Sequence, residues 1–278
     1  MMHDTTSNRR TVVRGALLAL GLLTLAGCAT PPSASDPAAV AAFNETNDRL
    51  EPLNRTMFKL DQGLDAALIR PVAWSYNKTV PDVARKRVSH VLDNVISPVT
   101  FINDLLQGEG RRAAQTFWRL VVNTTVGLGG MFDVADSAGV PQHTEDFGQT
   151  LAVWGVGDGT YLYLPLLGPS SIRDGIGLGV DAFGFDPIAW YSYNPHNMQW
   201  VQYAQLGAEL IDAKANIMQT QDELKKSSID YYAALRSAYR QYRAKEIRNG
   251  APLPPSALPN MDSEGDPFAE EPATKSPK

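Results

Sequence analysis

Residues 123–133 read NTTVGLGGMFD and open the part of the chain that decides its fold, a glycine-rich segment covering residues 126–180. The segment holds 12 of the 22 glycines, which alternate with apolar and aromatic residues rather than with serine. Flexible linkers have a different, serine-rich composition. Glycines in apolar surroundings allow backbones to approach closely and are typical of kinked or interrupted helices. We therefore expect a packed segment built from short, broken helices.

The same segment is apolar without containing a conventional membrane span. Its most apolar stretch, YLYLPLL at residues 161–167, is far shorter than the roughly 18 apolar residues that a transmembrane helix needs. Interrupted backbone is tolerated at membrane depth only where protein covers it or a polar cavity opens beside it. Two interpretations stay open: a membrane-embedded collar around a water-accessible passage, or an ordinary soluble core with glycine-rich packing. Charged residues flank the apolar patches: Asp133, Asp136, Asp146, Asp158, Arg173, Asp174 and Asp181.

Outside this segment, the spacing of apolar residues predicts helices and no series of alternating strands. Pro71 is expected to break or kink the first helix, and Pro81 to start the next. The apolar stripe of the first helix consists of Leu53, Met57, Leu60, Leu64 and Leu68. The later predicted helices are one ending near Pro98, one over residues 100–107 stopped by Gly108, an amphipathic one over 109–122, and two long ones over about 197–247 with a break near Ser227 and Ser228.

The chain begins with the features of a bacterial lipoprotein signal. Three arginines within residues 9–14 precede an uncharged run over residues 15–26, which is too short to remain as a membrane-spanning helix. The motif LAGC places Cys28 directly after two small residues, as cleavage before a lipid-modified cysteine requires. We therefore predict a removable signal peptide over residues 1–27. The alternative is an uncleaved leader with a cysteine there by chance.

Cys28 is the only cysteine in the 278-residue chain, so the chain cannot form an internal disulfide. We expect its sulfur to carry a covalent diacylglyceryl group and its amino group an N-acyl chain. One acyl chain gives only marginal binding, at about 0.8 kcal/mol per buried methylene, whereas the combined anchor is stable. Ala29 follows where an aspartate would favour retention in the inner membrane. The expected location is the periplasmic side of the outer membrane.

Composition divides the remaining chain into three predicted regions. Residues 28–47 form a lipidated flexible tether, residues 48–249 a folded helical domain, and residues 250–278 a disordered acidic, proline-rich tail. The tail is either a solvated end or an acidic docking segment for a soluble periplasmic partner. Loss of the signal peptide lowers the formal charge from −5 to −7, which argues against nucleic acid as a partner.

Catalytic and metal-binding patterns are weak. The triplet DFG at residues 146–148 occurs without the other kinase motifs. No metal site or cofactor is expected beyond the lipid on Cys28, because the candidate histidines are far apart in sequence. The enzyme alternative is a cryptic phospholipase that uses Ser170 or Ser171, although neither lies in a Gly-x-Ser-x-Gly motif. The separated histidines are His90, His143 and His196.

Five ordered blocks behind the signal peptide resemble the MlaA (VacJ) family of outer-membrane lipoproteins. The resemblance runs from about residue 48 to residue 247 and leaves out the tether and the tail. It implies an all-α fold: a ring-shaped single domain of kinked and broken helices around an amphipathic channel, lodged in the inner leaflet of the outer membrane. The blocks are LEPLNRTMF (50–58), PVTFINDLLQG (98–108), NTTVGLGGMFD (123–133), EDFGQTLAVWGVG (145–157) and LPLLGPSSIRD (164–174).

The resemblance also implies a function. Family members remove phospholipid misplaced in the outer leaflet, sit beside trimeric porins, and pass lipid to the periplasmic carrier MlaC for return to an inner-membrane transporter. This work requires a polar path for a headgroup beside an apolar path for acyl chains, and no bond is broken. We therefore expect a lipid transporter rather than an enzyme. The alternative is a structural lipoprotein that braces a porin without moving lipid.

We place the passage within residues 126–180. Four charged residues are candidates for the polar groups at its mouth: Asp133, Asp146, Arg173 and Asp174. For each of them, the alternative is a helix cap or a surface ion pair.

Overall fold

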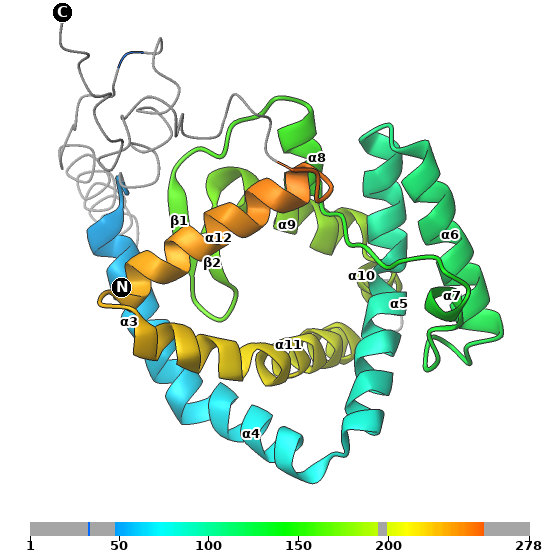
Figure 1. Cartoon of the computed structure of the whole chain (residues 1–278), viewed down its shortest axis with the longest axis horizontal. Coiled ribbons are helices and arrows are strands. Elements are labelled where there is room, and N and C mark those ends of the chain that lie inside the picture. Colours follow the sequence, from blue (N-terminus) through cyan, green and yellow to red (C-terminus); the bar gives the residue numbers. More distant parts are fainter. Residues whose placement is uncertain (1–32, 34–47, 194–198, 253–278) are drawn as a thin grey trace, which may run out of the picture.

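The computed structural model describes residue 33, residues 48–193 and residues 199–252. The predictions for the signal peptide, for Cys28, and for nearly all of the tether and the acidic tail lie outside the described residues. The described elements are mostly helical and follow one another around a ring (Figure 1). The predicted all-α, ring-shaped fold is therefore confirmed, with one short β-hairpin added.

The ring is closed by segments that are distant in sequence. Helices α5 and α6 form one side and α3 the opposite side, while α12 crosses towards α8 (Figure 1). The elements are α3 (Glu51–Leu64), the π-helical turn η2 (Asp65–Ile69), α4 (Arg70–Thr79), α5 (Asp82–Leu106), α6 (Gly110–Thr125), α7 (Val134–Ser137), α8 (Phe147–Val153), β1 (Tyr161–Leu164), β2 (Gly168–Ser171), α9 (Ile172–Val180), the π-helical turn η3 (Asp181–Phe185), α10 (Pro187–Tyr193), α11 (Gln199–Ser227) and α12 (Tyr231–Ile247).

Pro71 interrupts the regular α-helix without ending it. Helix α3 continues through η2 into α4, and the backbone N–H of Arg70 bonds to the carbonyl of Asp65, five residues earlier. This wider π-helical turn lies directly before Pro71, whose ring clashes with the preceding turn of a regular α-helix. The predicted break is thus a local change of helical register.

Helix α5 corrects the prediction of two separate helices around Pro98. It begins after Pro81, as predicted, but continues through Pro98 to Leu106. Buried side chains lie on both sides of Pro98, including Asn94 and Asn103, where α5 packs along α6. Many residues of α5 contribute to this packing, so its stabilisation outweighs the loss of the one backbone hydrogen bond that proline removes. The predicted stop at Gly108 is confirmed, and its φ angle is +79°.

The hairpin was not expected from the sequence, because strands of four residues are too short to show alternation. Strand β1 pairs antiparallel with β2, and Tyr161 lies opposite Ser171. The hairpin is attached to α3 by Asn54, which is 1% exposed. Its side-chain amide donates to the carbonyl of Tyr161 at 3.0 Å and accepts from the N–H of Tyr163 at 3.0 Å. The Asn54 side chain therefore pairs with the backbone of β1 as another strand would.

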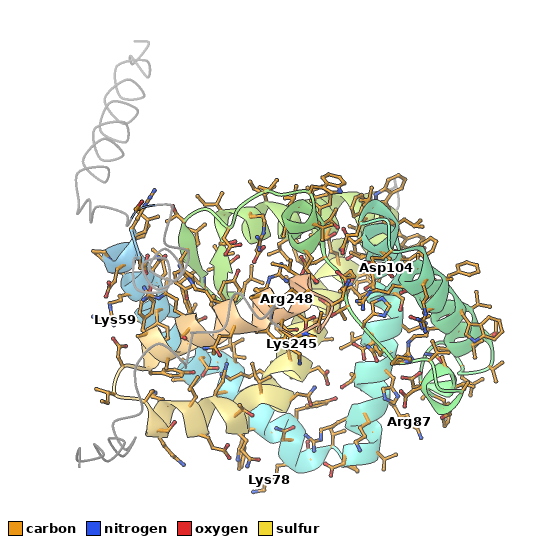
Figure 2. All side chains as sticks on the ribbon, turned by 45° about the horizontal axis from the view of Figure 1, so that its top comes forward. Lys59, Lys78, Arg87, Asp104, Lys245 and Arg248 are labelled. Carbon is orange, nitrogen blue, oxygen red and sulfur yellow. The ribbon has the colours of Figure 1, made fainter. Side chains whose placement is uncertain are left out.

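The interior is unusually polar. Among the described residues, buried polar and charged side chains outnumber buried apolar ones. Asn103, Asp104 and Thr150 are fully buried, and Asp104 lies where α5 meets α6 (Figure 2). Many large apolar side chains are exposed instead. Within the described ranges, no helix combines the length and the apolar character that crossing a membrane requires.

Gly177 provides a test of the packing between α8 and α9. A Cβ atom at this position would lie 2.3 Å from the backbone nitrogen of Gly148, whereas a Cβ atom at Gly179 would meet nothing within 4 Å. We predict that Gly177→Ala lowers the free energy of unfolding by about 1–3 kcal/mol, because the two backbones must separate. Denaturant titration of the purified protein in detergent measures this loss.

Gly179→Ala on the same helix is the matched control. It should be neutral or should raise the free energy of unfolding by up to about 1 kcal/mol, because alanine favours the helical conformation. Equal effects of the two substitutions would contradict the close contact between Gly148 and Gly177.

Candidate functional site

An amphipathic pocket of about 220 Å³ lies between α8, the hairpin, α9 and α12. One wall is apolar and comes from the hairpin and α9. The other wall carries three carboxylates, one guanidinium, one phenol and one serine hydroxyl. The apolar residues are Leu164, Leu167, Pro169 and Leu178, and the polar ones are Asp146, Ser170, Asp174, Asp181, Tyr239 and Arg243.

Asp146 reaches the polar wall because it caps α8. Its carboxylate accepts the N–H of Gln149 at 2.9 Å, which satisfies one of the free amides of the first helical turn. The same carboxylate receives both terminal nitrogens of Arg243, at 2.6 and 3.0 Å. Burial favours a raised pKa for Asp146, but the hydrogen bonds and charge of Arg243 outweigh burial and lower this pKa below its ordinary value.

Asp174 lies in the first turn of α9, one residue after Arg173. Its carboxylate accepts Nε of Arg243 at 2.9 Å and also the hydroxyl of Tyr239. Arg173, which is 4% exposed, donates to Asp174 at 2.9 Å and to Asp158. Burial opposes ionisation of Asp174, yet its bonds to Arg243 and Tyr239 lower its pKa. Helices α9 and α12 are therefore joined by a charged network.

Asp181 supplies the third carboxylate from the start of η3. It accepts the N–H of Phe147 at 2.7 Å and the side-chain amide of Asn103 at 2.9 Å. Burial raises the pKa of Asp181 to about 6, and the negative charge of Asp146 adds to this rise. The pKa of Asp181 therefore lies much closer to neutral pH than the lowered pKa values of Asp146 and Asp174 do.

The structure brings together three of the four predicted polar residues. Asp146 and Asp174 line the pocket, and Arg173 bonds to Asp174 behind it. Asp133 lies elsewhere, between α6 and α7, where it caps α7 and accepts from Arg119 at 2.7 Å. Burial opposes ionisation of Asp133, but Arg119 and the N–H of Asp136 lower its pKa. Asp133 and Asp146 are thus both helix caps, while only Asp146 also faces the amphipathic pocket.

Two residues of the polar wall were missed by the sequence reasoning. Tyr239 and Arg243 lie on α12, far along the chain from the glycine-rich segment. They are one helical turn apart, as are Tyr232 and Arg236 on the same helix. This repeated pairing of tyrosine and arginine is the signal that could have identified a helix face directed at carboxylates.

The arrangement can hold an amphipathic molecule with its polar end against the charged wall and its chains along the leucines. The two serines named in the enzyme alternative have structural contacts. The hydroxyl of Ser171 caps α9 by accepting the N–H of Asp174 at 3.1 Å, and that of Ser170 donates to the carbonyl of Ser171 at 3.4 Å. These contacts belong to the fold of the hairpin and α9.

The raised pKa of Asp181 leads to a prediction about pH. Its carboxyl binds a proton more tightly when folded than when unfolded, so its contribution to stability is full below about pH 4 and is lost as the pH rises to about 6. We predict that the difference in unfolding free energy between the wild type and Asp181→Asn narrows or reverses across this range. Urea unfolding at intervals between pH 4 and pH 7 measures it. A constant difference would contradict the raised pKa.

Comparison with protein families gives a match to the MlaA lipoprotein model over residues 46–246. Two similar proteins are described as intermembrane phospholipid transport system lipoprotein MlaA. The one from Escherichia coli is 34% identical over 255 residues, which cover 90% of this chain and 95% of that protein. The one from Haemophilus influenzae is 32% identical over 238 residues, covering 83% and 89%.

An uncharacterised protein from Rickettsia conorii is 33% identical over 204 residues, covering 73% of this chain and 79% of the relative. A solved structure from a study of the structural basis for maintenance of bacterial outer membrane lipid asymmetry matches with a TM-score of 0.61. Its sequence is 32% identical, and the match covers 72% of this chain and 99% of that one. The chain therefore belongs to the MlaA lipoprotein family.

Proposed function

We propose that this protein removes misplaced phospholipid from the outer leaflet of the outer membrane and delivers it to a periplasmic carrier. The observation that carries the proposal is the reversed polarity of the ring, with charged and amide side chains inside and large apolar side chains outside. Such a surface is unfavourable in water over large contiguous areas. It suits a protein that is surrounded by lipid at its rim.

Helix α6 illustrates the reversal. Its buried face includes Arg119 and Asn123, whereas Phe117 and Trp118 are more than half exposed. A helix at the surface of a soluble protein has the opposite arrangement. Side chains of α6 project outward from the edge of the ring (Figure 2), where acyl chains would surround them.

The tryptophans support the same location. All five are more than half exposed, although tryptophan is usually among the more buried residues. Indole rings concentrate at the boundary between headgroups and hydrocarbon, where the ring is in an apolar environment and its N–H meets polar groups. The residues are Trp74, Trp118, Trp154, Trp190 and Trp200.

The amphipathic pocket supports passage of lipid. Asp146 and Asp174 border its polar side, where a headgroup can avoid the high cost of entering hydrocarbon. Leu167 and Leu178 border its apolar side, which is suited to acyl chains. We assign the headgroup path to this polar wall, supported from behind by Arg173. A role for Asp133 in the path remains a prediction.

The names of the relatives agree with this function, since they describe a phospholipid transport lipoprotein and the maintenance of outer membrane lipid asymmetry. We further propose lipidation at Cys28, attachment at the periplasmic side, association with a trimeric porin and transfer to MlaC. Movement of lipid requires no chemical step, so we propose a transporter rather than an enzyme. The structural, porin-bracing alternative predicts that no phospholipid moves or copurifies.

The test of transport uses intact cells. Deleting the gene should raise the amount of phospholipid exposed in the outer leaflet, and restoring the wild-type gene should reverse the rise. We predict that Leu178→Trp fails to reverse it fully, because the larger ring fills part of the pocket of about 220 Å³. Labelling of surface phospholipid by an outer-leaflet-specific reagent measures the effect.

Leu178→Met is the control at the same position, because it keeps the volume and the apolar character and should restore the wild-type level. Both variants must be present in equal amounts at the outer membrane. If deletion has no effect, the transport function is wrong; if Leu178→Trp behaves like Leu178→Met, the assignment of this pocket is wrong.

Cys28→Ala tests the proposed anchor. Removing the attachment point should leave the domain folded but mislocalised, because the variant lacks the acyl chains that anchor the protein stably. Membrane fractionation locates the protein, and proteolysis of the purified variant reports its folding. A variant that stays in the outer membrane and keeps full activity would contradict lipidation as the anchor.

A further inference from the structure

The charge of the amphipathic pocket indicates which phospholipid headgroup it accepts. Its lining holds three carboxylates, those of Asp146, Asp174 and Asp181, and the one guanidinium of Arg243, so negative charges exceed positive charges by two. The pKa values of Asp146 and Asp174 are lowered, and burial raises the pKa of Asp181 only to about 6, so all three carboxylates are mainly ionised at neutral pH. The inference drawn from this charge rests on the proposed function, because it concerns the lipid class that the headgroup path takes.

The arginines at the polar wall do not cancel its negative charge. Arg243 directs both terminal nitrogens at Asp146 and its Nε at Asp174, so two carboxylates share one guanidinium. Arg173 approaches Asp174 from behind the wall, but it also bonds to Asp158, which offsets its charge. These five residues therefore carry more negative than positive charge even before Asp181 is included.

Asp181 is the carboxylate of the wall that has no bonded cation. Its two hydrogen-bond donors are neutral, namely the N–H of Phe147 at 2.7 Å and the side-chain amide of Asn103 at 2.9 Å. In the described part of the chain, Asp181 forms no ion pair. A carboxylate has about four acceptor positions, so two donors leave some of them unused. Because electrostatic attraction is stronger near the protein interior than in water, this charge favours a cation in the pocket.

Phospholipid headgroups differ in their ability to supply that cation. A headgroup that ends in a primary ammonium offers a positive charge and three N–H donors, in the same way as a lysine side chain. An anionic headgroup that ends in glycerol offers only neutral hydroxyl groups beside its phosphate. The wall attracts the ammonium and repels the phosphate. The leucines on the opposite wall meet acyl chains, which both classes of lipid share.

We propose that the amphipathic pocket selects zwitterionic phospholipids whose headgroup ends in a primary ammonium over anionic phospholipids. Asp181 and Asp146 are the residues that determine this selectivity. Asp181 contributes the charge without a bonded cation, and Asp146 contributes a carboxylate whose side chain is 41% exposed. The headgroup enters with its ammonium towards these carboxylates and its phosphate away from them.

The experiment is a titration of the purified mature protein in detergent, at constant ionic strength, with each of two probes. The probes are dihexanoyl phosphatidylethanolamine and dihexanoyl phosphatidylglycerol, both below their critical micelle concentrations. They have the same acyl chains, so the ratio of their Kd values reports on the headgroup alone. The Kd for phosphatidylglycerol should be about tenfold or more higher, because like charges repel and the charge-assisted hydrogen bonds are missing.

Asp146→Asn and Asp181→Asn should each lower this ratio about threefold or more, because each removes one of the two excess negative charges. Asparagine keeps the size of the side chain and can still cap α8 at position 146. Circular dichroism checks that both variants are folded, and either folded variant is sufficient for the test.

Asp230→Asn is the matched control for Asp146→Asn. Asp230 caps α12 and receives both terminal nitrogens of Arg55, as Asp146 caps α8 and receives those of Arg243. The side chains of Asp230 and Asp146 are both 41% exposed. Asp230 does not line the amphipathic pocket, so its substitution should leave the ratio of Kd values unchanged.

A preference for phosphatidylethanolamine that is reduced by a pocket variant and kept by Asp230→Asn supports the proposal. Equal binding of the two probes, or tighter binding of phosphatidylglycerol, overturns the selectivity but leaves the pocket as a lipid site. A preference that the pocket variants keep as fully as the control does overturns the role of the two carboxylates. If neither probe binds, both the selectivity and the assignment of the pocket are wrong, whereas transport itself is tested separately by the phospholipid exposed on intact cells.

Discussion

The structure depends on internal pairing of its buried charges. The guanidinium of Arg243 bonds to Asp146 at the start of α8 and to Asp174 in the first turn of α9, which joins three helices that are distant in sequence. A ring with an apolar rim has few polar partners outside, so these groups must satisfy one another. Buried ion pairs often add little net stability, but leaving one partner unpaired is strongly destabilising. The network therefore mainly determines which helices contact one another. Its net contribution to the free energy of unfolding is small.

The same constraint explains the hairpin and the glycines. Asn54 provides both a donor and an acceptor to β1, which would otherwise leave backbone groups of Tyr161 and Tyr163 unpaired inside the protein. Gly177 lets α9 approach the backbone of α8 closely enough for Asp146 and Asp174 to share Arg243. The amphipathic pocket results from these contacts, because its polar wall contains the charged network and its apolar wall consists of leucines and a proline from the hairpin and α9.

Local signals in the sequence were reliable where they concerned a single helix. The starts and stops at Pro81, at Gly108 and near Ser227 follow from backbone chemistry that neighbouring residues decide. The prediction failed at Pro98, where packing along α6 outweighs a local preference for a break. It was also silent on Arg243, because nothing within one segment indicates which distant carboxylates a buried arginine will meet.

The sequence by itself determined the helical class, the glycine-rich segment with its flanking charges, the membership of a family, and the prediction of a lipid anchor at Cys28. These properties are carried by motifs, periodicity and composition, which need no knowledge of distant contacts. Only the tertiary structure decided that Asp146 and Asp174 share one pocket while Asp133 lies in another place. The physical reason is that pairing and burial depend on closure of the ring, which brings α12 against α8 and α9.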